Sequence, residues 1–164
     1  MERERVRSAI KLVLWIYVIN LGIAFGAGLY EARVEIPQWF GTTSEGSLFW
    51  NAEAARESNS GLRFWAFIST GPLTLLTLAS LFLARKFRET AGKWWFGSAL
   101  LSLGERIFTF TYFIPVMLTL MEASSGFTND VVSQAVQWER LNYLRHALSF
   151  FSWFAALKAL VNLR

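Results

Sequence analysis

Four long apolar runs, separated by charged connections, constrain this chain more than any other feature of its 164 residues. A membrane-spanning helix needs about 20 mostly apolar residues, and the runs are continuous rather than alternating as in barrel strands. Because hydrocarbon offers the backbone no hydrogen-bond partner, each run is expected to form a helix. The sequence therefore predicts one all-α domain, an integral membrane antiparallel four-helix bundle, with spans at about 10–36, 62–84, 94–121 and 141–163.

The composition supports this class and excludes several kinds of site. Hydrophobic residues make up 54% of the chain and charged residues 17%, against about 25% charged in soluble domains. With no cysteine, disulfides, iron–sulfur clusters and thiolate zinc sites are excluded. His146, the single histidine, could form a mixed metal site only with carboxylates such as Glu31 and Glu35, and the Glu-x-x-His repeat of di-iron bundles is absent. We expect no metal and no cofactor.

The net charge of +4 is better explained by membrane orientation than by nucleic acid, because no soluble segment combines a basic stripe with aromatics. The N-terminus, the 85–93 connection and the C-terminal end hold ten of the sixteen Lys and Arg residues. The 31–63 and 122–146 regions are mainly acidic. Both termini are therefore expected in the cytoplasm of a multi-pass cell-membrane protein, with the lipid bilayer as its surroundings.

The first run has two possible interpretations. Basic residues precede it, as in a signal peptide, but its apolar part exceeds the usual h-region of about 7–15 residues, so a retained anchor is expected. The 37–61 segment then forms an exoplasmic loop. Within it, SLFWNAEAARES (47–58) predicts either a short surface helix, with Leu48, Phe49 and Trp50 on its apolar side, or a flexible loop.

Tryptophans lie close to the predicted span ends, which is typical of rings at a membrane–water interface. They are Trp39, Trp65, Trp94, Trp95 and Trp138.

Polar and small residues share one face of several predicted spans, and such faces normally point into a bundle. In the first span the stripe consists of Asn20, Ala24, Ala27, Glu31 and Glu35. Gly22 and Gly26 form a small-xxx-small pair that allows close approach of another helix.

The second and fourth spans carry similar stripes. Thr70, Thr74 and Thr77 align beside Gly71-Pro72, where proline removes a backbone hydrogen bond. In the fourth span the polar or small positions are Asn142, Arg145, Ser149, Ser152 and Ala156.

Charges inside the third span are the strongest functional signal. Each charge at a helix centre costs about 2.5–3.5 kcal/mol on insertion scales. Glu105 and Arg106 must therefore be compensated, either as a structural pair or as a site that handles protons or orients a ligand. At the exoplasmic end, Glu31, Arg145 and His146 lie at matching depths in antiparallel neighbours. Further groups expected near this layer are Glu35, Arg63, Tyr112 and Glu122.

Several motifs in the same order resemble the anthrone-oxygenase-like family of small four-span membrane proteins. They are GAGLYEARVEIP (26–37), a second span with a central proline, FTYFIP (110–115) and WERLNYLRHALSFF (138–151). The resemblance implies roles for Glu31, Asn142 and Arg145. Characterised fungal members oxidise anthrones to anthraquinones without an obvious cofactor, whereas most members are of unknown function.

These observations lead to one functional hypothesis and two alternatives. The first is a small membrane enzyme or binder of an apolar, aromatic or quinone-like molecule, held in the exoplasmic half of the bundle. In this hypothesis Glu31 or Glu105 acts as the base. Arg145 or Arg106 stabilises a developing oxyanion, and Tyr112 or His146 assists the reaction. Its expected ligand contacts are Asn20, Glu35, Thr70 and Asn142.

The first alternative is a non-catalytic subunit of a larger membrane complex or a homo-oligomer. Its contacts would come from the face of Gly22 and Gly26 and from the charged pair in the third span. The second is transport, which ranks last because four spans are too few for an inverted-repeat transporter without oligomerisation.

Overall fold

A computed structural model describes residues 2–87, 90–123 and 129–163. Arg88, Glu89 and Arg164, three of the charges behind the predicted orientation, lie outside the described residues. In chain order the elements are α1 (Glu2–Tyr30), η1 (Glu31–Glu35), η2 (Ile36–Trp39), β1 (Phe40–Thr42), β2 (Leu48–Trp50), α2 (Ala52–Ser58), η3 (Gly61–Thr70), α3 (Pro72–Ala84), α4 (Thr90–Phe108), η4 (Thr109–Phe113), α5 (Ile114–Glu122) and α6 (Asn129–Asn162). The segments η1, η3 and η4 are π-helical, and η2 is a 3-10 turn.

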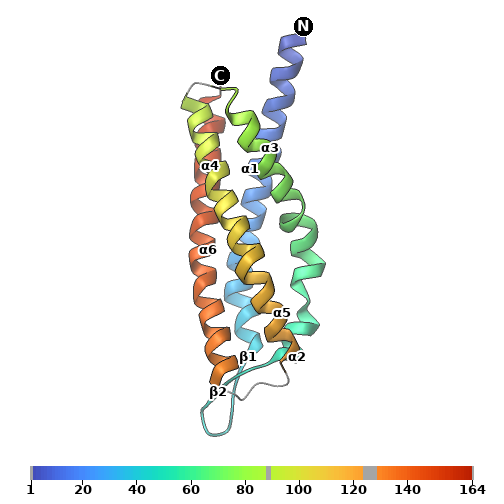
Figure 1. Ribbon diagram of the computed structural model, residues 1–164, viewed down its shortest axis with the longest axis vertical. Coiled ribbons are helices and arrows are strands. Elements are labelled where there is room, and N and C mark those ends of the chain that lie inside the picture. The colour runs from blue at the N-terminus through green and yellow to red at the C-terminus, as the bar shows by residue number, and fades with distance from the viewer. Residues whose placement is uncertain (1, 88–89, 124–128, 164) are drawn as a thin grey trace.

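Four long helical rods stand side by side along the longest axis of the molecule (Figure 1). They are α1 with η1, η3 with α3, α4 with η4 and α5, and α6. Helix α6 packs against α4 and α1, and α3 packs against the same two helices, so the contacts close a ring. The N- and C-termini lie at the same end (Figure 1). The predicted all-helical class is confirmed.

The second rod changes from π-helix to α-helix at Gly71-Pro72. The N–H of Gly71 donates to the carbonyl of Ala66, five residues earlier, at 3.2 Å. Proline has no N–H to donate, so it suits the first turn of a new α-helix. The predicted interruption is therefore present as a change of helical pitch, and it alters which side chains of this rod share a face.

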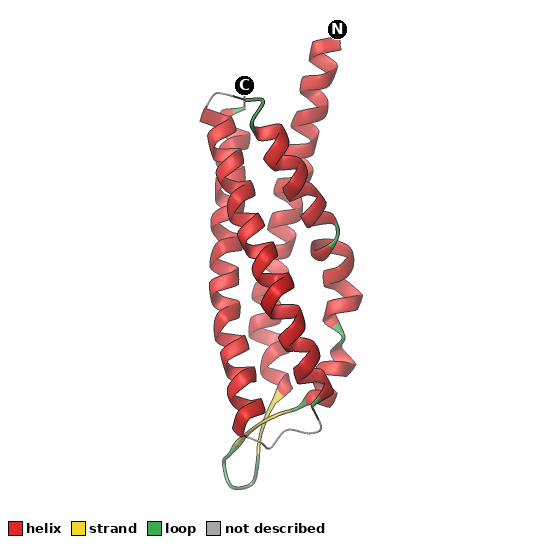
Figure 2. Ribbon diagram, in the orientation of Figure 1, coloured by secondary structure: helices red, strands yellow, loops and turns green. Residues whose placement is uncertain are grey.

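The connection between the first two rods differs from both alternatives for 47–58, a surface helix over the whole segment and a flexible loop. Its first part is a strand, because Leu48–Trp50 pairs antiparallel with Phe40–Thr42 (Figure 2). Gly46, with φ of +81°, supplies the left-handed turn residue that the hairpin needs. Only the second part is helical. It begins where the side chain of Asn51 accepts a hydrogen bond from the N–H of Ala54 at 3.1 Å, which caps α2.

Three of the tryptophans near the span ends face the interior instead of a membrane interface. Trp39, Trp95 and Trp138 are at most 4% exposed. Trp39 and Trp138 pack with Trp50, Phe113 and neighbouring residues in a buried cluster under the hairpin. Position along a span indicated the depth of these rings but not the direction in which they point, which depends on the neighbouring helices.

The indole of Trp50 joins the hairpin to the end of α5. It is fully buried, and its Nε1–H donates to the carbonyl of Leu120 at 2.9 Å. Trp50→Phe removes this bond and leaves a small cavity, so we expect a loss of about 1–3 kcal/mol in unfolding free energy, measured by denaturant titration in detergent. Trp94→Phe is the control, because Trp94 is 41% exposed and should give almost no change. Equal effects of the two substitutions would contradict the anchoring role of Trp50.

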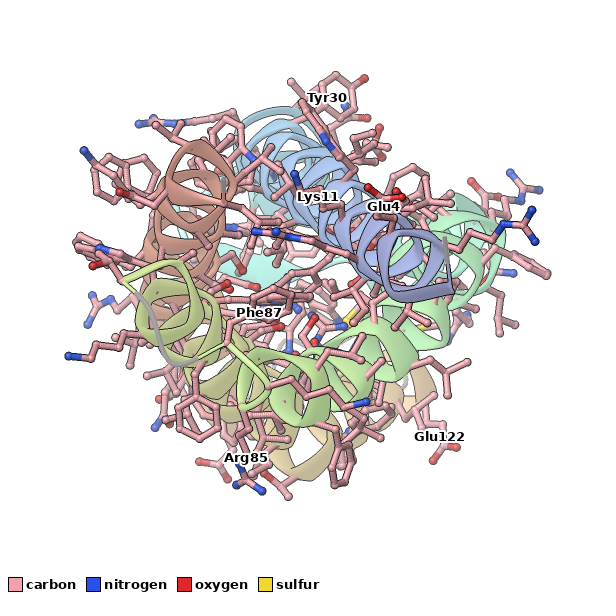
Figure 3. All side chains as sticks on the ribbon, turned by 90° about the horizontal axis from the view of Figure 1, so that it is seen from above. Glu4, Lys11, Tyr30, Arg85, Phe87 and Glu122 are labelled. Atoms are coloured by element: carbon pink, nitrogen blue, oxygen red, sulfur yellow. The ribbon has the colours of Figure 1, made fainter. Side chains whose placement is uncertain are left out.

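The outer faces of the rods are strongly apolar. The segments Glu4–Trp39 and Gly61–Ala84 are long and apolar enough to cross a membrane. Large side chains exposed on the rods include Trp15, Ile19, Phe67, Leu75, Phe82, Ile107, Phe151 and Val161. Viewed along the rods, charged side chains such as Arg85 and Glu122 point outward (Figure 3). A soluble monomer rarely exposes so much apolar surface, so these faces are suited to lipid.

Candidate functional site

A cavity of about 340 Å³ lies among the rods at the hairpin half of the molecule. This volume is within the range of about 300–1,000 Å³ typical of small-molecule sites. Large apolar side chains form much of its wall, namely Trp39, Trp65, Phe113, Ile114, Met117, Leu118, Met121 and Trp138. Its polar and charged lining consists of Glu31, Asn59, Ser60, Ser69, Thr70, Glu105, Thr109, Arg106, Arg145, His146 and Ser149. The cavity thus combines an aromatic wall with a small set of charged groups.

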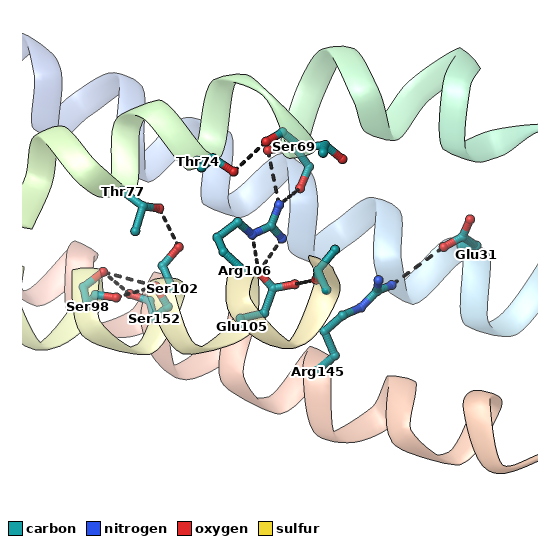
Figure 4. Close-up of polar contacts among 12 residues, drawn as sticks. Glu31, Ser69, Thr74, Thr77, Ser98, Ser102, Glu105, Arg106, Arg145 and Ser152 are labelled. Carbon is teal, nitrogen blue, oxygen red and sulfur yellow. Dashed lines mark hydrogen bonds and ion pairs between the residues drawn. The ribbon is translucent and has the colours of Figure 1, made fainter. Parts of the chain in front are cut away.

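The mid-span charges Glu105 and Arg106 form a buried pair and are 3% and 5% exposed. The Nε–H and Nη2–H groups of Arg106 both donate to the same oxygen of Glu105, the first at 2.6 Å. Arg106 also donates through Nη1 to the hydroxyl of Ser69 at 2.8 Å and to its carbonyl at 3.2 Å (Figure 4). The second oxygen of Glu105 accepts from Thr109 at 3.0 Å. This arrangement compensates both charges within one chain.

Glu31 is held differently, at the point where α1 becomes π-helical. One carboxylate oxygen accepts hydrogen bonds from the hydroxyl of Ser60 at 2.6 Å and the indole of Trp65 at 2.8 Å. The other oxygen lies 4.0 Å from a guanidinium nitrogen of Arg145 (Figure 4). The carboxylate therefore connects three of the rods, since these partners come from the start of the second rod and from α6.

The guanidinium of Arg145 lies over aromatic faces. It is 4.7 Å from the ring centroid of Phe113 and 5.8 Å from that of Trp65. Arginine is well suited to such stacking because its charge is delocalised over a plane. Its ion pair with Glu31 is long, at 4.0 Å. Arg145 consequently presents a cation to the cavity with fewer close polar contacts than Arg106.

His146, the residue after Arg145, is 7% exposed and also lines the cavity. Its Nε2 atom has no hydrogen-bond partner among the described residues. The ring lies against α1 at Gly28, where an added Cβ would stand 2.7 Å from Cε1 and 2.9 Å from Nδ1. Any larger residue at position 28 would therefore displace the imidazole.

The cavity brings together five of the six side chains for which chemical roles were expected, namely Glu31, Glu105, Arg106, Arg145 and His146. Tyr112, the sixth, lies outside the lining. Its ring stacks on Phe108 with centroids 5.5 Å apart and contacts Phe113. The ring thus packs with its aromatic neighbours and is not part of the cavity wall.

Of the four expected ligand contacts, Thr70 lines the cavity and the other three do not. The amide of Asn20 donates to the carbonyl of Ile68 at 2.9 Å, and Glu35 accepts from Ser58 at 3.3 Å. Asn142 is 1% exposed, and neither side-chain polar atom has a partner among the described residues. Arg63 and Glu122, expected near the same layer, are exposed.

Sequence reasoning missed the residues that orient the charged groups. Ser60 and Trp65 are five residues apart, a spacing that does not repeat on an α-helical face. A π-helix, with hydrogen bonds between residues five apart, brings both to Glu31. The other missed residue is Gly28, because the expected helix contact was assigned to Gly22 and Gly26. An added Cβ at Gly22 would meet Trp153 at 3.1 Å, whereas Gly26 has no atom within 4 Å.

The residues present offer acid–base and anion-binding chemistry. In the described part of the chain, no group of three or more His, Asp or Glu side chains is arranged to hold a metal ion. The cavity instead places a carboxylate, an imidazole and a guanidinium beside an aromatic wall.

Comparison with known proteins identifies the family. Residues 63–155, more than half of the chain, match the family model described as anthrone oxygenase. The chain belongs to the anthrone oxygenase family. This confirms the resemblance deduced from the sequence motifs. No curated protein and no solved structure matches the chain.

The anthrone oxygenase match includes most of the charged groups of the cavity. Glu105, Arg106, Arg145 and His146 fall within it, whereas Glu31 and Gly28 precede its first residue. The cavity is thus completed by a part of the chain outside the matched region.

Proposed function

We propose that the protein is a multi-pass cell-membrane protein whose four rods form an antiparallel bundle spanning the bilayer. The support is the apolar exterior of the rods, the two segments that satisfy the length and hydropathy of a span, and the termini at one end. The excess of Lys and Arg near that end supports a cytoplasmic location for both termini. The cavity then lies in the exoplasmic half.

Within this bundle the cavity binds an apolar aromatic molecule with an acidic C–H group and a ketone oxygen on the ring, as in an anthrone. The observation that carries this proposal is the position of Arg145. Its guanidinium lines an aromatic cavity, lies over Phe113 and Trp65, and forms a long ion pair, at 4.0 Å, with Glu31. A cation in such surroundings is suited to stabilise negative charge that develops on a ligand oxygen.

The proposed reaction is oxidation of the CH₂ group of an anthrone by dioxygen. Removal of one proton leaves an electron pair that delocalises onto the ketone oxygen of the anthrone, which faces Arg145. The carbon then bonds to one oxygen atom of O₂, and the peroxide takes up a proton. Loss of the remaining C–H proton and of hydroxide, together one water, leaves a carbonyl. The balance is one anthrone and one O₂ giving one anthraquinone and one water.

Binding of anthrone to the protein in lipid nanodiscs tests this proposal. Quenching of tryptophan fluorescence should saturate, because Trp39 and Trp65 line the cavity. Arg145→Gln is expected to raise the Kd about tenfold, which is about 1.4 kcal/mol. Arg140→Gln is the control, because Arg140 is exposed on the same helix. Production of anthraquinone and consumption of O₂ are then followed in air.

Two results would contradict the proposal. If anthrone shows no saturable binding to the wild-type protein, the ligand class is wrong. If Arg145→Gln and Arg140→Gln bind anthrone equally well and also form anthraquinone at equal rates, the oxyanion role of Arg145 is wrong.

Assembly with a second chain is the alternative, and the structure gives it less support. The charged pair expected at such an interface has its partners within this chain. Gly22 lies against Trp153, and only Gly26 of the small-residue pair faces open space. Copurification of a stable partner that is lost in Arg106 variants would favour assembly over ligand binding.

A further inference from the structure

Three side chains that line the cavity are chemically able to accept a proton from a ligand, namely Glu31, Glu105 and His146. They differ in how completely their acceptor atoms are already used. A proton acceptor must reach the ligand with a lone pair that no neighbouring donor occupies.

Glu105 is occupied on both oxygens. One oxygen accepts two hydrogen bonds from the guanidinium of Arg106, and the other accepts from Thr109. Each of these bonds stabilises the carboxylate in its present position. Use of Glu105 as a base would neutralise it and leave Arg106 as a buried cation without its partner.

Glu31 accepts hydrogen bonds on one oxygen, and its other oxygen lies at ion-pair distance, 4.0 Å, from Arg145. The donors to the first oxygen are Ser60 and Trp65. Protonation of Glu31 would remove the charge that positions Arg145. Glu31 is therefore better suited to hold the cation in place than to take a proton.

His146 is less engaged by neighbouring donors than either carboxylate. Its side chain is buried and lines the cavity, and Nε2 has no partner among the described residues. Buried polar atoms of Asn20, Ser80, Trp95 and Asn142 also lack a partner among the described residues, but none of these four residues lines the cavity. Of the three possible proton acceptors, His146 is therefore the one that is least engaged by its neighbours. The missing side chain at Gly28 provides the space that the ring occupies.

We propose that His146 is the proton acceptor for the acidic C–H of the ligand and that Gly28 is its positioning residue. The inference rests on the proposed function. The C–H bond breaks, the proton goes to a ring nitrogen of His146, and the electron pair remains with the ligand, delocalised onto the oxygen that faces Arg145. The acid–base partner of this reaction is thus the imidazole and not either carboxylate.

Hydrogen exchange of anthrone in D₂O without oxygen tests this step separately from oxidation. The wild-type protein should accelerate deuterium incorporation at the CH₂ group above the protein-free rate, as read by mass spectrometry. His146→Gln should reduce this acceleration at least tenfold and leave the Kd for anthrone within about threefold. If His146→Gln exchanges anthrone at the wild-type rate, the assignment is overturned. If the wild-type protein binds no anthrone, the proposed function fails first, which is a different result.

Chemical rescue distinguishes a proton acceptor from a merely structural histidine. His146→Gly removes the imidazole and leaves space where it stood. Added imidazole should restore exchange to His146→Gly and have no effect on Arg145→Gln. Absence of rescue in a His146→Gly protein that still binds anthrone would overturn the assignment.

Two glycines on α1 provide a matched pair for the positioning role. Gly28→Ala places a Cβ in contact with the imidazole, whereas Gly26→Ala meets no atom within 4 Å. We expect Gly28→Ala to reduce the acceleration of deuterium exchange about tenfold, whereas Gly26→Ala should keep the wild-type rate. Both proteins should elute as folded species in gel filtration. Equal exchange by the two variants would overturn the role of Gly28.

Discussion

Arg106→Met is expected to destabilise the protein by about 3–5 kcal/mol, since it leaves Glu105 buried without its counter-charge. Glu105 is 3% exposed and would retain only the bond from Thr109. Ser69 would lose the guanidinium that now binds its hydroxyl and its carbonyl. The measurement is reversible unfolding in mixed detergent micelles, followed by circular dichroism.

The double variant Glu105→Gln/Arg106→Met is the control for this prediction. It removes both charges together and keeps an acceptor for Thr109, so it should recover at least half of the lost stability. If the double variant is no more stable than Arg106→Met, the energetic coupling of the pair is disproved. Anthrone binding by the double variant would show that the pair acts through structure rather than through contact with the ligand.

Glu31→Ala is expected to have the second largest effect, about 2–3 kcal/mol in unfolding free energy. Truncation leaves the hydroxyl of Ser60 and the indole of Trp65 without their acceptor, and because both residues are half-buried each lost bond costs about 1 kcal/mol. It also removes the carboxylate that faces Arg145. The same variant should therefore bind anthrone more weakly. Both effects are measured on one preparation, by unfolding and by fluorescence titration.

Glu35→Ala is the matched control, because Glu35 lies one helical turn after Glu31 on the same rod. It is only half-buried and accepts a single long hydrogen bond, 3.3 Å from Ser58. We expect a change of about 1 kcal/mol or less. Equal losses from the two alanine substitutions would show that Glu31 is a solvated helix end and not the centre of a polar network.

The charged residues of the site illustrate what periodicity could predict. The 3.6-residue repeat placed Glu31 on the inward face of the first span, and burial of Glu31 agrees with it. The same repeat put Glu35 on that stripe, but Glu35 instead bonds Ser58 beyond the cavity. The change to a π-helix at Glu31 alters the angle between successive side chains, and nothing in the sequence marked this change.

Periodicity also failed to predict which aromatic side chains reach the site. Tyr112 was expected there and is not part of the cavity wall, whereas Trp65 was not expected and binds Glu31. Both are aromatic residues near a charged group in the sequence. Tyr112 packs on Phe108 and Phe113 and does not line the cavity, whereas the π-helical first part of the second rod brings the indole of Trp65 to Glu31. Side-chain direction at these positions depends on local helical pitch and on neighbouring rings.

The sequence by itself determined the helical class, the family and most of the charged residues that line the cavity. It could do so because a charge in an apolar run is costly, so such residues must face a polar or protein-lined interior. Only the tertiary structure decided which groups are already satisfied. Ser69, the second partner of Arg106, and the partners of Glu31 come from other rods, and the space beside His146 comes from a glycine on α1. Hydrogen bonding between distant segments depends on distances of a few ångströms, which the order of residues in one chain does not specify.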